Sequence, residues 1–369
     1  MMQTLHVYQY LMSLVRGRGH DAALGSESPA MLNRSFRDET PHVHVICSNA
    51  GCLSILRDAS FVQPKIADAV AEIGRHLQLD VHTVEAFLRH NPIQIDSEPH
   101  SARRRLFLDE YNGQCKDLAA AFRQLAESHF ARLCAPASPA DANALTEPYV
   151  DDALRTILQT HGSQAAAHYD SARGNGYAVF EYIHPPARLA EKSRQAADFL
   201  AGLAEDGGEP AADRQAHGFF LLSYVLQGRD PLAGGLAAFV HGLLELGADE
   251  RAARIEATTA KALFWHGAPV NYIGRVATQA RVVDGIEIGA DDHILLMLPW
   301  ASHDSGCTAK DSLAFGGGLH VCAGQALALT IAEAWLWALK QHHRHIDWAG
   351  LKPGRALPVV FRQYRSTPA

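Results

Sequence analysis

Apolar residues recur along most of this chain with the spacing of amphipathic helices. A repeat of three to four positions predicts helices within residues 64–90, 116–133, 150–167, 189–203, 211–246, 249–266 and 325–340. Strand-like patterns are confined to short runs, such as 42–50 and a predicted hairpin around Asp284-Gly285. Two weaker patterns lie near the ends, an amphipathic segment at 5–15 and a strand at 357–362. We therefore predict a mainly helical chain with small β-sheets.

The composition is that of an ordinary globular protein, with 47% hydrophobic and 20% charged residues in a chain of 369. A net charge of −7 argues against general binding to nucleic acid. The sequence has no apolar run of about 18 residues, the length of a membrane span, and residues 1–17 are too polar for a convincing signal peptide. The six cysteines show no C-x-x-C spacing. We expect reduced thiols and a cytoplasmic protein without nucleic-acid or membrane partners.

One glycine-rich stretch, F-G-G-G-L-H-V-C-A-G at residues 315–324, carries a cysteine directly before a predicted helix. Free N–H groups and the helix dipole favour an anion at this position, so the pKa of the Cys322 thiol is expected to fall. The glycines allow tight turns and the close approach of a large flat ligand. The alternative is a plain turn before a core helix, with Cys322 as a small buried apolar residue.

The spacing of this stretch resembles the haem-ligand loop of the cytochrome P450 family at every motif position. The resemblance implies the cytochrome P450 fold in a single domain over residues 1–369, with residues 1–40 of uncertain structure. It also implies haem b as the cofactor, with Cys322 as the axial thiolate and metal ligand. By the same resemblance, Phe315 shields the sulfur, Gly316 forms the turn and His320 meets a haem propionate.

Three basic residues elsewhere match positions that contact haem propionates in that family. His100 and Arg104 are four residues apart, so they share one face of a helix that Asp96 and Pro99 would begin. Basic residues near a helix N-terminus are disfavoured unless an anion is bound there. Arg275 stands where the family places a propionate-binding arginine on a strand. The alternatives are a solvated first turn for His100 and Arg104, and an edge-strand position for Arg275.

The helix at 211–246 resembles the long distal helix of the family, in which an acid followed by a threonine handles protons for O2 activation. The acid position is Asp230, but the alcohol position is Pro231. Proline has no hydroxyl and no N–H, so we expect an opened or kinked helix here. A peroxide-using branch of the family has Arg-Pro, whereas Arg229 is one position further from the proline. Alternatively, Arg229 and Asp230 form a local solvated pair.

The family also has an E-x-x-R motif, which braces the cysteine loop. Its positions in this chain are Ala262 and Trp265, so the motif is absent. Literal matches at Glu72–Arg75 and Glu191–Arg194 precede the distal helix and are expected on the surface. Apolar packing by Phe264 and Trp265 is the expected replacement, because apolar residues can replace a buried ion network without loss of stability.

Three functions remain open. The first is a haem-thiolate monooxygenase that acts on a small molecule of specialised metabolism, with a ferredoxin-type electron donor and Asp230, water or substrate as proton relay. Arg103 and Arg105 would then offer a basic surface to the donor. The second is peroxide-dependent or redox-neutral chemistry, such as dehydration or rearrangement, which Pro231 favours. The third is a non-catalytic haem or gas-binding protein.

Overall fold

The structure is a computed structural model. It describes residues 36–37, 43–96, 99–134, 141–174, 176–180, 186–204, 211–357 and 360–365. The predicted amphipathic segment at 5–15 lies outside these residues.

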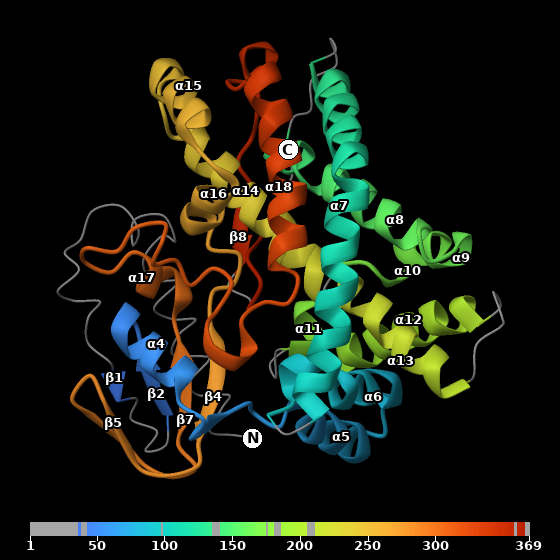
Figure 1. The fold of residues 1–369 in the computed structure, drawn as a ribbon, viewed down its shortest axis with the longest axis vertical. Coiled ribbons are helices and arrows are strands. Elements are labelled where there is room, and N and C mark those ends of the chain that lie inside the picture. Colours follow the sequence, from blue (N-terminus) through green and yellow to red (C-terminus); the bar gives the residue numbers. More distant parts are fainter. Residues whose placement is uncertain are drawn as a thin grey trace.

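Helices make up most of the described chain, as predicted, and Figure 1 shows α7, the longest of those described, side by side with α18. The helices are α4 (Asn49–Arg57), α5 (Ile66–Leu77), α6 (His82–His90), α7 (Pro99–Leu133), α8 (Glu147–Gln159), α9 (Ser163–Ala167), α10 (Tyr169–Ala172), α11 (Tyr177–Phe180), α12 (Pro186–Ala204), α13 (Ala211–Ser223), α14 (Arg229–Leu244), α15 (Ala248–Ala257), α16 (Ala260–Gly267), α17 (Leu298–Ser302) and α18 (Gln325–His342).

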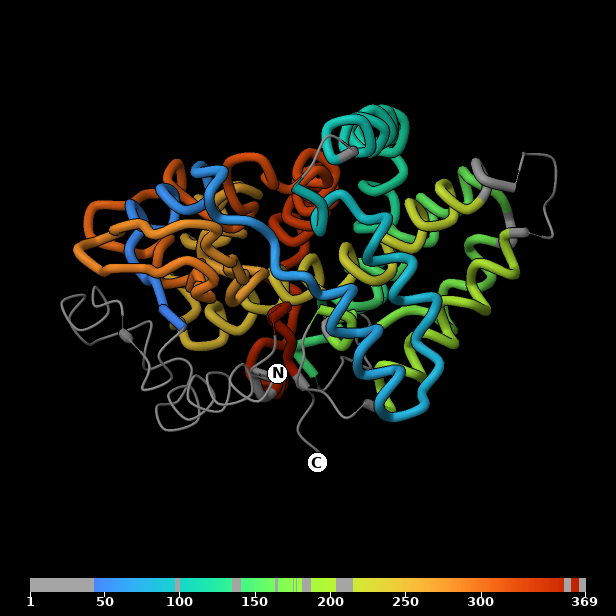
Figure 2. Tube along the Cα trace, turned by 90° about the horizontal axis from the view of Figure 1, so that it is seen from below, coloured from blue at the N-terminus to red at the C-terminus, as the bar shows by residue number. Residues whose placement is uncertain are grey.

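The main sheet is small and lies to one side of the long helices α7 and α18 (Figures 1 and 2). The main sheet has the order β1-β2-β7-β4-β3, in which only β2 and β7 pair in parallel. Its strands are β1 (Phe36–Arg37), β2 (Val43–Ile46), β3 (Phe61–Val62), β4 (Ile273–Ala277) and β7 (His293–Leu296). The mainly helical fold with small sheets is therefore confirmed.

Two hairpins complete the strands. β5 (Arg281–Val283) and β6 (Ile286–Ile288) form the predicted one, with Asp284 and Gly285 at φ values of 51° and 76°. Positive φ at both central residues is the requirement of the tight hairpin turn. The predicted strand at 357–362 is wrong in its bounds, because β8 (Arg355–Leu357) and β9 (Gln363–Arg365) pair instead.

Some predicted helices divide where side chains cap the backbone. The predicted helix at 249–266 becomes α15 and α16, because Thr258 Oγ1 donates to the Arg254 carbonyl oxygen while Thr259 Oγ1 accepts from the Ala262 N–H at 3.2 Å. A threonine side chain that accepts such an N–H bond begins a new helix. The run at 150–167 similarly becomes α8 and α9.

The largest core cluster joins α7, α8, α14 and α18. Trp335 of α18 is fully buried and donates its indole N–H to the Leu145 carbonyl oxygen at 2.7 Å. Tyr149 of α8 donates its hydroxyl to the Ile331 carbonyl oxygen at 2.8 Å. These contacts fix α18, and therefore the loop that precedes it. None of the helices within the described ranges has both the length and the apolar character that crossing a bilayer requires.

Candidate functional site

A cavity of about 360 Å³ lies where α7, the α13–α14 helix, the start of α18 and strands β4 and β7 meet. The cysteine loop at residues 315–324 closes one side of it. Apart from the cationic residues on its edge, the wall is mainly apolar, with aromatic side chains such as Phe107, Phe180 and Phe361. Such a concave, largely apolar space is the usual form of a small-molecule or cofactor site.

The cysteine loop has a backbone that only glycine accepts easily at two points. Gly316 and Gly318 have φ values of 71° and 64°, in the left-handed region. A Cβ atom at residue 318 would also collide with the carbonyl oxygen of Leu56. The Cys322 N–H donates to the Phe315 carbonyl oxygen at 2.8 Å and closes the loop. The turn therefore presents the Cys322 side chain to the cavity.

The environment of the Cys322 thiol raises its pKa, contrary to the expected fall. Burial raises the pKa, while the Gly324 N–H and the charge of Arg104 lower it without compensating. Cys322 has exposed surface, and the residue lines the cavity. The position before α18 is as predicted, but removal from bulk water outweighs the effect of the helix N-terminus. A cation or metal in the cavity would reverse this balance.

His100 and His320 meet at the edge of the cavity. His100 is 2% exposed, and neither of its ring nitrogens has a hydrogen-bond partner within the described chain. Its ring centroid lies 4.7 Å from that of His320. His320 Nε2 lies 2.8 Å from Asp96 Oδ1, while its Nδ1 has no partner there. A buried imidazole nitrogen without a hydrogen-bond partner is energetically costly. His100 and His320 are therefore suited to donate hydrogen bonds to a ligand bound in the cavity.

Arg275 of β4 and Arg104 of α7 line the same cavity. Arg275 is 4% exposed and donates to Gln63 Oε1 at 3.2 Å and to the Gly274 carbonyl oxygen at 2.7 Å. Burial lowers its pKa to about 10, although the charge of Asp96 acts in the opposite direction. Neither arginine forms an ion pair with a carboxylate among the described residues. A buried guanidinium of this kind suits an anionic ligand.

The distal helix widens on the N-terminal side of Pro231. Residues Tyr224–Gly228 form a π-helical turn between α13 and α14, and the Arg229 N–H bonds to the Tyr224 carbonyl oxygen. The expected opening of the helix is therefore present, as a π turn that begins seven residues before Pro231. Pro231 lines the cavity, whereas Arg229 and Asp230 do not.

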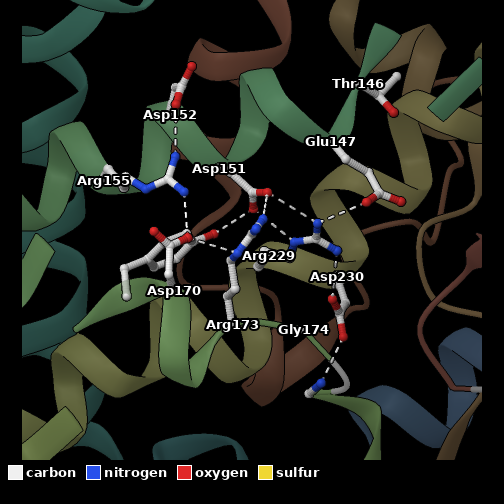
Figure 3. Close-up of polar contacts among 12 residues, drawn as sticks. Thr146, Glu147, Asp151, Asp152, Arg155, Asp170, Arg173, Gly174, Arg229 and Asp230 are labelled. Carbon is white, nitrogen blue, oxygen red and sulfur yellow. Dashed lines mark hydrogen bonds and ion pairs between the residues drawn. The ribbon is translucent and has the colours of Figure 1, made fainter. Parts of the chain in front are cut away.

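Arg229 and Asp230 belong to a network of charged side chains (Figure 3), and neither residue lines the cavity. Arg229 contacts Asp151 at 3.0 Å, Glu147 at 3.1 Å and Asp230 at 3.3 Å. Asp230 Oδ2 accepts the Gly176 N–H at 2.8 Å. The alternative of a local solvated pair is wrong, because the Asp230 side chain is 0% exposed.

The pKa values of both members of this pair are raised, although burial acts on them in opposite senses. Burial raises the pKa of Asp230, against the lowering effects of Arg229 and the Gly176 N–H. Burial also acts to lower the pKa of Arg229, but the carboxylates of Asp151, Asp230 and Glu147 outweigh it and raise that pKa. The role of Asp230 as a proton relay stays a prediction, and the direction of its side chain counts against it.

Phe264 and Trp265 contact the cysteine loop and the segment that precedes it. Phe264 of α16 is 1% exposed, and its ring packs edge-to-face on Phe315, with centroids 5.2 Å apart and planes at 71°. Trp265 donates its indole N–H to the Ser302 carbonyl oxygen at 2.8 Å. Phe264 therefore supports the cysteine loop directly, and Trp265 holds the segment that precedes the loop.

The two literal E-x-x-R matches lie on the surface, as expected. Glu72 and Arg75 form an exposed ion pair on α5, and Glu191 and Arg194 are exposed on α12. Sequence reasoning missed other polar residues of the cavity wall, among them Gln63 and Gln227. Gln227 was detectable, because it precedes Pro231 by four residues and therefore shares its helix face.

Solved structures of bacterial enzymes match this architecture over most of its length. P450BioI, in complex with an acyl carrier protein that carries hexadec-9Z-enoic acid, aligns with a TM-score of 0.70 at 14% identity, covering 91% of this chain and 94% of that one. P450 RauA, complexed with a biosynthetic intermediate of aurachin RE, gives 0.69 at 16% identity, covering 91% and 93%. The chain has the cytochrome P450 fold.

A third P450 structure, CYP109E1 from Bacillus megaterium in complex with testosterone, aligns with a TM-score of 0.67 at 15% identity, covering 90% of this chain and 93% of that one. No model of a protein family matches this sequence, and no curated protein matches it. At these identities the P450 fold is shared, while the chemistry has to be argued from this chain's own residues.

Proposed function

We propose that this protein is a haem-thiolate enzyme of the cytochrome P450 type, which acts on a small, largely apolar molecule. The observation that carries the proposal is the position of Cys322, whose side chain opens onto an apolar cavity beside unpaired basic groups. Haem b ligated by a cysteine thiolate supplies oxygen activation, because the thiolate donates electron density to the iron.

The described residues fit this cofactor at both its metal and its carboxylates. Cys322 would ligate the iron. Burial raises the pKa of the free thiol, and a bound metal would displace the proton from the sulfur. His100, with both ring nitrogens unpartnered in the described chain, would meet a propionate together with Arg104 and Arg275. His320 would contribute its unpartnered Nδ1, since Asp96 occupies its other nitrogen.

Two loop residues would complete the haem site. Phe315 would shield the sulfur from water, and Phe264 packs against that ring at 5.2 Å. Gly316 has the left-handed backbone that turns the chain toward Cys322. Both residues line the cavity. The apolar wall would exclude water from the bound substrate.

Oxygen insertion, with electrons from a ferredoxin-type donor, is the default reaction. An acidic donor needs a basic docking surface. Arg105 is exposed on α7 and remains available. Arg103 is already engaged, because it donates to the carbonyl oxygens of Arg89 and His90 at 3.0 and 3.2 Å. In this reaction, water or the substrate would relay protons, because the Asp230 carboxylate does not line the cavity.

A redox-neutral reaction is the second candidate. Pro231 presents no hydroxyl to the cavity, and Asp230 is held by Gly176 and Arg229. The peroxide branch is less well supported, since it needs a free arginine for a substrate carboxylate. Arg229 instead contacts three carboxylates and does not line the cavity.

Haem titration tests the cofactor site. Haemin added to the apoprotein should bind at one per chain, and Arg275→Lys should weaken binding roughly tenfold or more, because lysine lacks the bidentate donor geometry. Arg281→Lys is the control. Arg281 lies on the β5–β6 hairpin outside the cavity, where its side chain pairs with Asp58. Equal haem affinity of the two variants would contradict the assignment of Arg275.

Turnover then separates the candidate reactions. The loaded protein is assayed with O2 and a ferredoxin–reductase pair, with peroxide alone, and without any oxidant. Product only in the first assay supports oxygen insertion, and product in the third supports the redox-neutral reaction. A thiolate-type haem protein that turns over nothing in any assay supports the gas-binding alternative.

A further inference from the structure

One face of the distal helix borders the cavity along its whole central part. Its lining residues recur at four-residue intervals, in two rows: Ser223, Gln227 and Pro231, then Tyr224, Gly228 and Leu232. This spacing marks a single helical face. Any molecule in the cavity on this side meets the side chains of these rows, so the polar groups among them contribute to the choice of ligand.

Two of the three polar side chains on this face already have partners. Ser223 donates its hydroxyl to the Phe220 carbonyl oxygen at 2.6 Å and lies 3.1 Å from the Tyr111 hydroxyl. The Tyr224 hydroxyl donates to Gln114 Oε1. Their hydrogen-bonding capacity is therefore directed into the protein and away from a ligand.

The third polar side chain, Gln227, has no such partner. Its carboxamide forms no hydrogen bond with any residue that the structure describes, and its amide nitrogen is shielded from water. An enclosed amide that lacks a partner costs about 1–3 kcal/mol relative to a satisfied one. A half-turn of the carboxamide exchanges its donor and acceptor, so it can match either kind of group.

The backbone is irregular at the same place. In a regular α-helix the Gln227 carbonyl oxygen would accept a bond from the N–H of residue 231, but Pro231 has no N–H. The π turn at Tyr224–Gly228 ends one residue later. On this helix face, the side chain of Gln227 therefore forms a local polar site beside the widened turn of the helix.

We propose that Gln227 is a specificity-determining residue, whose carboxamide hydrogen-bonds to a carbonyl or hydroxyl oxygen of the bound substrate. The inference rests on the proposed function, and it narrows the substrate to an apolar skeleton that carries at least one such oxygen near the distal helix. A molecule without that oxygen leaves the amide unsatisfied and binds more weakly.

Paired ligands that differ in one oxygen test this inference. The haem-loaded protein is titrated calorimetrically with 1-tetralone and with tetralin, which have the same ring skeleton. The wild-type protein should bind 1-tetralone more tightly, and Gln227→Leu should reduce that preference by roughly two- to tenfold, the effect of one neutral hydrogen bond. Leu232→Met, on the same helix face, is the control and should change both affinities together.

A thermal unfolding measurement excludes a merely structural role. Because Gln227 satisfies no other group within the described structure, Gln227→Leu should unfold at the same temperature as the wild-type protein or higher. An unchanged preference in Gln227→Leu, or no preference in the wild-type protein, overturns the inference. Those results leave the proposed function intact, because the haem spectrum of the wild-type protein is recorded independently and tests that function alone.

Discussion

The two sides of the cavity are built by different forces. On the cysteine side, glycine backbone geometry and apolar rings hold the loop at 315–324. On the distal side, buried charges around Arg229 hold α14 against α8 and the segment at Gly176. A local sequence motif can specify the first arrangement, whereas the second depends on residues as far apart as Asp151 and Asp230.

The two sides also differ in which residues hold the backbone and which line the cavity. The cysteine loop is contiguous, so its residues must stay together to present one sulfur. The distal network uses the acid at position 230 to hold the backbone, and it leaves the cavity wall to Pro231 and Gln227. On the distal side, the residues that hold the backbone are therefore separate from those that line the cavity.

Breaking the distal network should have the largest effect. Arg229→Met leaves Asp151 and Asp230 buried without their shared cation, so we expect a loss of about 3–5 kcal/mol in the free energy of unfolding, measured by urea denaturation at pH 7. Arg89→Met removes an exposed arginine that pairs with Asp68 and Glu85, and it should cost about 1 kcal/mol or less. Equal losses in the two variants would show that the network is not a structural element.

On the cysteine side, Gly318→Ala tests backbone geometry in place of charge. The left-handed φ of 64° and the collision with the Leu56 carbonyl oxygen should together cost about 3–4 kcal/mol. Gly306→Ala measures the cost of the left-handed φ alone, because Gly306 has a φ of 81° and open space around it. Urea denaturation that finds the same cost for both variants would contradict the close approach at Gly318.

The two sides should also respond differently to pH, through Lys192. This lysine is 3% exposed and donates to the carbonyl oxygens of Ala172 and Gly174. Burial lowers its pKa from 10.5 to about 8, although Asp230 and Glu191 act to raise it and Arg229 adds to the lowering. Between these values the unfolded chain holds more protons than the folded protein, so the contribution of Lys192 to stability rises with pH.

The measurement is the free energy of unfolding of the wild-type protein minus that of Lys192→Met, followed from pH 7 to 11. The difference should rise by up to about 3 kcal/mol across the window. Lys340→Met is the control, since Lys340 also donates to two carbonyl oxygens, those of Glu256 and Thr258. If the difference in the free energy of unfolding for Lys192→Met does not change with pH, or if it rises equally for Lys340→Met, burial of the Lys192 charge does not destabilise the protein.

The contact between Phe264 and Phe315 should give the smallest effect. A double-mutant cycle of Phe264→Leu and Phe315→Leu measures their coupling, which we expect to be about 1 kcal/mol for an edge-to-face pair. Ionic strength should not change it, because no charge takes part. A coupling near zero would mean that Phe264 does not brace the cysteine loop.

Much of the fold and the position of the cysteine loop could be predicted because their signals are local. The helical periods, the turn at Asp284-Gly285 and the loop before α18 each occupy neighbouring residues. His100, Arg104 and Arg275, which the family resemblance indicated, all line the cavity, while their contact with haem propionates stays a prediction.

The remaining features depend on tertiary contacts that no local pattern contains. The direction of Asp230 is set by Gly176, which lies 54 residues earlier, and by the π turn that precedes it. The pKa of Cys322 depends on burial by distant segments, which outweighs the helix N-terminus. The split at Thr258 and Thr259 depends on two side-chain caps that compete with helix continuation.

The most direct test of the account is the absorption spectrum of the reduced, CO-bound protein, recorded for the wild type and for Cys322→Ser. We predict a Soret maximum near about 450 nm for the wild type, as thiolate-ligated haem gives, and its loss in the variant. The same maximum in both proteins, or a wild-type protein that binds no haem, would contradict the claim that Cys322 is the iron ligand.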